Sequence, residues 1–142
     1  MVELASPIAA IRKTGRHGNC ASGIGVALSE LRRGSIVEVA SWPGRNEALL
    51  TAIKMATGLK LPATPGGGHV SGKRTGFGIG PGRYLLSDEP TGLVSTLAEA
   101  VSIETGTITD LSHGRTAFRI AGPRAEWVLA KLFAIDFALP AF

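Results

Sequence analysis

The sequence contains a single cysteine, Cys20, among its 142 residues. One cysteine excludes an internal disulfide framework and any zinc site built on several cysteines. No apolar run approaches the roughly 18 residues of a membrane-spanning helix, and Glu3 precedes every lysine and arginine, which argues against a secretory signal. These absences predict a soluble, cytoplasmic protein. The length fits one domain of mixed α and β structure.

Charge is also scarce, and it is unevenly spread. Only 18% of the residues are charged, against the usual ~25%, and 15 basic residues against 11 acidic ones give a net charge of +4. Most of this excess lies in residues 1–35, which hold Arg12, Lys13, Arg16, Arg32 and Arg33 against Glu3 and Glu30. We expect this glycine-containing stretch to form an irregular basic arm with a short strand at residues 24–28. The arm would either wrap a partner or lie on the protein's own surface, and residues 36–142 would form the domain.

Regular structure is predicted to begin at residue 36. Residues 36–42 alternate apolar and polar side chains and are rich in β-branched residues, which favours a strand. Asn46 is a suitable N-cap for a helix that Gly58 would end. The prolines and the glycine run within residues 62–76 predict a loop.

A hairpin and a second helix are predicted next. Residues 77–79 and 83–86 fit two short strands, and Gly80-Pro81-Gly82 between them has the composition of a tight turn. Apolar residues then recur at helical spacing up to Val101, with Thr91 as the N-cap.

The remainder predicts two strands and a last helix. The strands are expected at residues 107–111 and 116–121, with a turn at His113-Gly114. Pro123 suits the first position of the helix, whose buried face would consist of Ala125, Val128, Leu129 and Leu132. From residue 36 the first six elements follow the β-α-β-β-α-β order of a ferredoxin-like fold, an α+β architecture with helices on one face of an antiparallel sheet.

The glycine-rich stretch at residues 76–82 does not match a nucleotide-binding motif. A dinucleotide fingerprint requires G-x-G-x-x-G before a helix, but Pro81 and Arg83 stand where glycine would be needed, and a strand is predicted to follow. A P-loop also fails, because Gly72-Lys73 is followed by Arg74 rather than by serine or threonine. A hairpin turn is the better interpretation.

The histidines and the cysteine predict no metal site. His17, His69 and His113 lie far apart and share no ligand spacing, whereas a metal ion needs three or four converging ligands. Cys20 has basic neighbours that favour the thiolate. Without an identified base, we expect it to be a small apolar filler or an idle thiol.

Asp110, Ser112 and His113 are the residue types of a catalytic triad. A triad is formed by tertiary geometry rather than by neighbours in one tetrapeptide. Aspartate and serine at a strand end more often hydrogen-bond the following turn. The sequence therefore predicts no catalytic, cofactor-binding or metal-binding residue.

The aromatic residues argue against a nucleic-acid partner. They make up 6% of the chain, and the predicted central strands lack the Phe or Tyr pair on which ferredoxin-like sheets stack RNA bases. Trp127 is preceded by Arg124 at i−3 and followed by Lys131 at i+4, so we expect a cation–π contact on its helix. The tryptophan would either fill a groove or contact another chain.

Several segments together resemble one family. Residues 110–131, from Asp110-Leu111-Ser112 to Lys131, resemble the central signature of the gamma subunit of heterotetrameric sarcosine oxidase. Residues 25–30 and 37–44 are similar to that family's opening. Residues 80–86 are similar to its Gly-Pro-x-x-Trp-Leu-Leu hairpin, with Tyr84 in place of the tryptophan, and residues 135–137 to a later stretch. The family is distantly related to the folate-binding fold of glycine-cleavage T proteins.

This resemblance implies a non-catalytic subunit of an enzyme that oxidatively demethylates sarcosine to glycine, with folate as the one-carbon acceptor. FAD, FMN, NAD and tetrahydrofolate would be bound by the other subunits and none by this chain. The implied partners are the alpha and beta, and also the delta, subunits, with no nucleic acid and no membrane. The family continues beyond Phe142 with further strands and a helix, so the resemblance also implies a C-terminally truncated domain.

Two other functions stay open from the residues. One is a stand-alone folate-binding, aminomethyltransferase-like protein, which the basic charge suits because folate is a polyanion. The other, less favoured, is an RNA-binding ferredoxin-like module.

Overall fold

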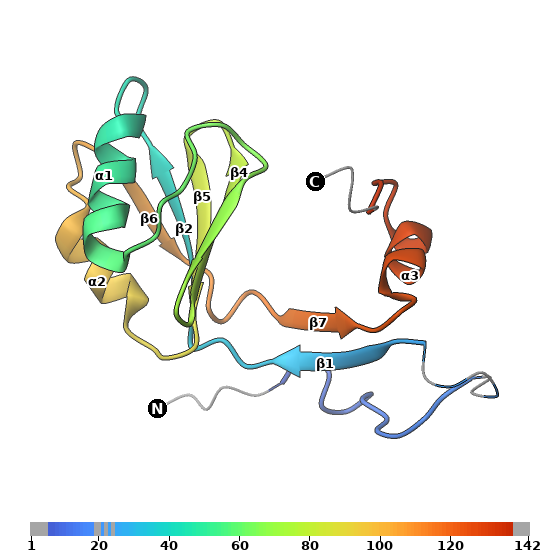
Figure 1. Ribbon diagram of the computed structural model, residues 1–142. Coiled ribbons are helices and arrows are strands. Elements are labelled where there is room, and N and C mark those ends of the chain that lie inside the picture. Colours follow the sequence, from blue (N-terminus) through green and yellow to red (C-terminus); the bar gives the residue numbers. More distant parts are fainter. Residues whose placement is uncertain (1–5, 19–20, 22, 24, 138–142) are drawn as a thin grey trace. The chain divides into compact units, whose positions relative to one another are not determined.

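The computed structural model describes residues 6–18, 21, 23 and 25–137, so Cys20 and Ile24 lie outside the described part. The chain divides into two units (Figure 1). We call Arg32–Thr116 the core unit, and the residues up to Leu31 together with those from Ala117 onward the terminal unit. The division expected from the sequence, an arm over residues 1–35 and a domain over 36–142, is a different one and stays a prediction.

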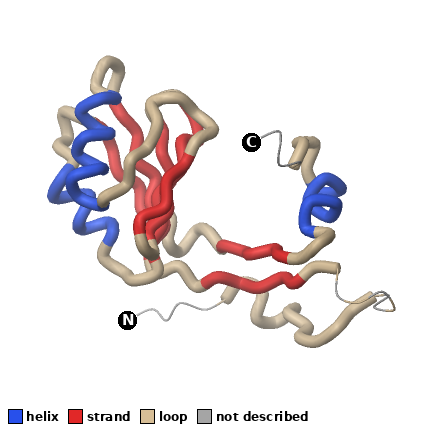
Figure 2. Tube along the Cα trace, in the orientation of Figure 1, coloured by secondary structure: helices blue, strands red, loops and turns tan. Residues whose placement is uncertain are grey.

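An antiparallel five-stranded sheet is central to the core unit (Figure 2). Its order is β3-β4-β5-β2-β6, and its strands are β2 (Ser35–Ser41), β3 (Gly68–Ser71), β4 (Arg74–Gly80), β5 (Arg83–Asp88) and β6 (Gly106–Asp110). Val39 in the middle of β2 lies opposite Tyr84 on one side and Ile108 on the other. Helices α1 (Asn46–Thr57) and α2 (Leu93–Ala100) lie on the same side of this sheet (Figure 1). The predicted α+β class with an antiparallel sheet is confirmed.

The hydrophobic core lies between this sheet and its two helices. Side chains of a strand alternate between the faces of the sheet, so Val37 and Val39 are fully buried while Glu38 between them is only partly covered. The other main members of the cluster are Leu49, Ile53, Leu59, Tyr84, Leu86, Leu93 and Leu97. Full burial of one such aliphatic side chain contributes about 1.5–3 kcal/mol, so this cluster is the main source of stability in the core unit.

The prediction of a loop over residues 62–76 is wrong in its second half, which contains β3 and the start of β4. Glycine normally weakens a strand. Here Gly68 lies opposite Phe77, and a Cβ atom on Gly68 would come within 2.5 Å of the Phe77 ring. The absent side chain makes room for the aromatic ring, so a residue that indicates a loop in the sequence permits strand pairing in the fold.

Two predicted helix caps are wrong and one is confirmed. The N-cap position of α1 falls one residue before Asn46, and the Asn46 side chain accepts a 2.8 Å hydrogen bond from the Tyr84 hydroxyl. Helix α2 begins after Gly92 rather than Thr91, with a glycine φ of 108° that other residues rarely adopt. Gly58 ends α1 in the left-handed conformation, as predicted, with a φ of 75°.

The terminal unit contains a two-stranded antiparallel sheet of β1 (Ala27–Leu31) and β7 (Ala117–Ala121). The strand predicted at residues 24–28 therefore lies further along the chain. The strands predicted on either side of the His113-Gly114 turn both exist, but they pair with different partners, β6 with β2 and β7 with β1. Each strand pairs with a strand that is distant in the sequence, so the local sequence does not predict the pairing.

The last helix, α3 (Ala125–Leu132), starts two residues later than predicted, so Pro123 precedes it. Its predicted buried face is wrong, because α3 has no buried residue and Leu132 is 70% exposed. Among the described residues of the terminal unit, none is buried. Helical spacing defines an apolar face, but such a face is buried only where a second layer covers it.

Candidate functional site

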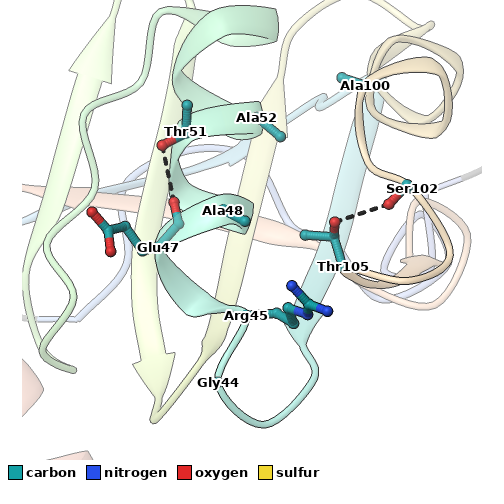
Figure 3. Close-up of a pocket in the computed structure, with 9 residues that line it drawn as sticks. All are labelled: Gly44, Arg45, Glu47, Ala48, Thr51, Ala52, Ala100, Ser102 and Thr105. Atoms are coloured by element: carbon teal, nitrogen blue, oxygen red, sulfur yellow. Dashed lines mark hydrogen bonds between the residues drawn. The ribbon is translucent and has the colours of Figure 1, made fainter.

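A shallow hollow of about 650 Å³ lies in the core unit, between the start of α1 and the segment after α2, and its lining residues are drawn in Figure 3. Its polar groups are engaged locally. The Thr51 hydroxyl donates to the Glu47 carbonyl at 3.0 Å, and the hydroxyls of Ser102 and Thr105 share a 2.9 Å hydrogen bond. The other lining residues are Gly44, Arg45, Ala48, Ala52 and Ala100. These three hydroxyls therefore bond a backbone carbonyl or each other rather than a side chain that could act as a base.

Asp110 and Ser112 form a structural turn, as predicted. Both the backbone N–H of Ser112, at 2.9 Å, and its hydroxyl donate to Asp110 Oδ1. The Ser112 oxygen also accepts the N–H of Ile36 at 3.0 Å, which joins the end of β6 to the start of β2. These hydrogen bonds, the side-chain one first, lower the pKa of Asp110. The pKa is lowered because a hydroxyl that donates to a carboxylate stabilises its negative charge. Together these hydrogen bonds stabilise the turn after β6.

The histidines are not assembled into a metal site. Within the residues that the structure describes, no group of three or more His, Cys, Asp and Glu side chains could hold a metal ion. The His17 ring lies 3.2 Å from the Lys13 carbonyl, and His69 lies on β3, where its buried Nδ1 has no hydrogen-bond partner. The prediction for Cys20 lies outside the described residues.

The glycine-rich stretch forms the β4–β5 hairpin, as predicted. Gly82 in the turn has a φ of 64°. Gly78 exchanges two backbone hydrogen bonds of 2.9 Å with Gly66 and Gly67, and a Cβ atom on it would lie 3.3 Å from the Thr64 carbonyl oxygen. Glycine here permits close approach of a neighbouring chain segment.

The terminal unit holds a second hollow of about 950 Å³, which we call the basic groove. It is bordered by residues of the 8–17 segment, by β1 and by the start of α3. The exposed large apolar side chains in its lining are Leu28, Phe118 and Trp127, which are 70%, 48% and 58% exposed. Among the described residues of its lining, the lysines and arginines are Arg12, Lys13, Arg16 and Arg124, against a single carboxylate, that of Glu30.

Trp127 lies at this groove, and Lys131 Nζ is 4.1 Å from its ring centroid. The predicted cation–π contact is therefore confirmed for Lys131. Leu28 and Phe118 were not predicted as groove residues. They come together through the pairing of β1 with β7, which lie about 90 residues apart in the sequence. Local sequence patterns do not indicate which strands pair.

The curated relatives and the solved structure that this chain matches point to one family. No protein-family model matches the chain. The sarcosine oxidase subunit gamma of Corynebacterium sp. strain U-96 is 39% identical over 88 residues, which are 60% of this chain and 42% of that protein. The subunit of the same name from Arthrobacter sp. is 31% identical over 121 residues, 82% of this chain and 58% of that protein. The chain thus spans about half the length of the curated relatives that it matches.

A solved structure gives the same result. It is heterotetrameric sarcosine oxidase from Corynebacterium sp. U-96 in complex with pyrrole 2-carboxylate, matched with a TM-score of 0.69 and 30% identity over 80% of this chain and 58% of that one. Separately, none of the described helices is long and apolar enough to cross a membrane. Sequence and fold together confirm the resemblance: over the length that it covers, this chain is a homologue of the gamma subunits of sarcosine oxidase.

Proposed function

We propose that this chain serves as the gamma subunit of a heterotetrameric sarcosine oxidase, as a non-catalytic structural component that supports assembly. The observation that carries the proposal is the exposure of the terminal unit. None of its described residues is buried. Seven of its large apolar side chains are 48–76% exposed, namely Ile11, Leu28, Phe118, Trp127, Leu132, Phe133 and Ile135.

This exposure has a physical consequence. A two-stranded sheet is at best marginally stable in water, and it needs a further layer to be independently stable. Ordering its backbone costs about 1–2 kcal/mol per residue, which apolar burial must offset. An interface with partner subunits supplies that burial, since permanent complexes bury large and mainly hydrophobic surfaces.

The proposed partners are the alpha and beta, and also the delta, subunits of the enzyme, in the cytoplasm. These would hold FAD, FMN, NAD and tetrahydrofolate and demethylate sarcosine, while this chain would hold no cofactor and contact neither nucleic acid nor membrane. The family resemblance supports this division. The structural roles of Asp110, Ser112 and the glycine-rich hairpin are consistent with it.

We also propose a ferredoxin-like classification for the core unit. With the edge strand β3 set aside, its elements follow the order β2-α1-β4-β5-α2-β6, which supports the β-α-β-β-α-β pattern. The neighbouring strands run β6-β2-β5-β4 and pair antiparallel. This arrangement supports the assignment because each helix then connects two strands that have one other strand between them.

Co-expression of the full chain with the other subunits of the enzyme from the same source tests the proposed function. With an affinity tag on this chain, we expect a complex that carries flavin absorbance and contains one copy of the chain by native mass spectrometry. The same subunits expressed with the tag alone serve as the control. A chain that purifies without any flavoprotein subunit contradicts the proposal.

The basic groove favours one alternative, a stand-alone folate-binding protein, because its cations lie beside the aromatic residues Phe118 and Trp127 and folate is an aromatic polyanion. Titration of the isolated full chain with tetrahydrofolate tests this alternative. Micromolar binding by the chain alone would favour it over a purely structural role.

A further inference from the structure

We propose that the basic groove is the docking site for an apolar, acidic segment of a partner subunit. This inference rests on the proposed function and deepens it, because it assigns the contact to one surface and states the chemistry of its occupant. The groove is formed wholly by the terminal unit, the unit whose described residues include none that is buried.

The register of β1 and β7 places apolar side chains of the groove on one face of their sheet. Leu28 lies opposite Ile120, and Glu30 lies opposite Phe118. Since alternate residues of a strand share a face, these four side chains lie on one face of the β1–β7 sheet. Leu28 and Phe118 of this face are 70% and 48% exposed, and Trp127 adds an indole ring that is 58% exposed. Apolar side chains of an occupant would bury this surface.

The border of the groove is cationic, which selects the charge of the occupant. Among the described residues of its lining the one carboxylate, that of Glu30, accepts a 2.8 Å hydrogen bond from Ser6 and lies 4.0 Å from Arg12. Lys13, Arg16 and Arg124 add three further cations. Carboxylates on the occupant would therefore be attracted, whereas basic residues would be repelled.

The same charge disfavours a second copy of the chain as the occupant. A symmetric dimer brings the same patch of both subunits together, which would place one cationic border against the other. A small anion also fits less well, because filling the groove would leave Leu132, Phe133 and Ile135 beyond it 53–70% exposed. A protein surface can cover both areas at once.

Charge reversal in the co-expressed complex tests the inference. We compare the double variant Lys13→Glu/Arg16→Glu with a matched control in the core unit, Lys54→Glu/Lys60→Glu, whose side chains are exposed and lie outside the groove. Affinity for the other subunits, measured by interferometry at about 150 mM salt, should fall at least about 10-fold in the groove variant and less than about 2-fold in the control. The wild-type affinity should also weaken as salt rises, and that dependence should shrink in the groove variant.

A second measurement locates the occupant. A photo-crosslinking amino acid at position 28, in the full chain within the complex, should join a peptide of a partner subunit that contains both acidic and apolar residues. Trp127→Ala should weaken binding to a similar extent as the charge reversal, while circular dichroism of the free variant stays unchanged.

The outcomes separate the two proposals. If the wild-type chain joins the complex and both double variants bind equally well, the docking site is wrong and the proposed function stands. If the wild-type chain joins no complex, the proposed function fails. Crosslinks from position 28 to a second copy of this chain would overturn the inference in favour of a dimer. Crosslinks to the partner subunit that form only after bound tetrahydrofolate is removed would overturn it in favour of folate as the occupant.

Discussion

Helices α1 and α3 carry apolar residues at the same helical spacing, yet their faces end in different environments. In the core unit, Leu49 and Ile53 of α1 are fully buried. In the terminal unit, Leu129 of α3 is only partly covered and Leu132 is 70% exposed. The core unit has a five-stranded sheet and a second helix to cover α1, whereas the sheet of the terminal unit has two strands. The number of covering layers, more than the local pattern, decides whether an apolar face is buried.

This contrast indicates where the two units obtain their stability. The core unit contains its own hydrophobic cluster, so contacts within the unit supply its stability. The described residues of the terminal unit include no buried side chain, so under the proposed function we expect its order to depend on surface that a partner subunit supplies. Substitutions in the two units should therefore act differently, on folding in one and on assembly in the other.

The largest contrast is expected between two leucines. Leu97→Ala, at a fully buried position of α2, should lower the free energy of unfolding by about 2–5 kcal/mol through lost burial and a residual cavity. Leu132→Ala, at a position that is 70% exposed, should change it by less than about 0.5 kcal/mol. Urea denaturation of the full chain, followed by circular dichroism, measures both. Losses of similar size would show that the terminal unit has a core of its own.

Close backbone approach in the core unit gives the next effect. A Cβ atom on Gly106 would collide with the Ala40 carbonyl of the neighbouring strand. Gly106→Ala should therefore destabilise the chain by about 1–3 kcal/mol and lower its melting temperature. Gly80→Ala is the control, because its Cβ atom would have no neighbour closer than 3.9 Å, on Arg83. Equal melting temperatures for the two variants would contradict the tight β2–β6 pairing.

Ion pairs should differ between the units as well. Arg74 Nε donates to Asp88 Oδ2 at 2.7 Å, and the Asp88 side chain is 5% exposed. Arg74→Met would leave a buried carboxylate without its cation and should cost about 1–3 kcal/mol. In the terminal unit, the Arg12–Glu30 pair is longer, at 4.0 Å, and Arg12 is 56% exposed. Arg12→Met should cost at most about 1 kcal/mol, and denaturation at pH 7 ranks the two.

The smallest effect concerns protonation at the end of β6. The Ser112 hydroxyl, and then its backbone N–H, lower the pKa of Asp110. A lowered pKa in the folded state means that the carboxylate stabilises the fold above the unfolded-state pKa of about 3.9. That stabilisation is lost as pH falls through the folded-state pKa.

Ser112→Ala removes the hydroxyl, which has the larger effect of the two donors on the pKa of Asp110. The substitution should therefore raise that pKa toward its ordinary value. An NMR titration of the side-chain carboxyl carbon measures the shift, and Asp110→Asn identifies the signal by removing it. An unchanged pKa in Ser112→Ala would show that the hydroxyl is not the main cause.

Much of the core unit could be predicted because its signals are local. The alternation of β2, the left-handed Gly58 and the turn at Gly82 each follow from the properties of a few neighbouring residues. The family resemblance also depends on residues in sequence order, and the comparisons confirm it. Two errors in the same unit concern residues that have other partners in the fold: the Asn46 side chain bonds Tyr84 rather than capping α1, and Gly68 pairs with Phe77 in a strand rather than lying in a loop. The third error is a shift of one residue, from Thr91 to Gly92, at the start of α2.

The basic groove could be predicted only in fragments. The basic charge of the early residues and the Trp127–Lys131 contact are visible in the sequence. The groove itself requires β1 to pair with β7 across about 90 residues. The apolar–polar periodicity of a strand does not indicate which strand it will pair with.

By itself, the sequence determined the kinds of elements, most of their positions and the family to which the chain is similar, because backbone preferences and motif order are properties of short segments. Tertiary structure alone decided that β6 and β7 pair with different strands, that the apolar face of α3 stays exposed, and that Leu28, Phe118 and Trp127 line one groove. The physical reason is that burial and strand pairing are relations between distant parts of the chain. The chemistry of a single residue determines which kinds of neighbour it favours, but not which residues of the chain become its neighbours.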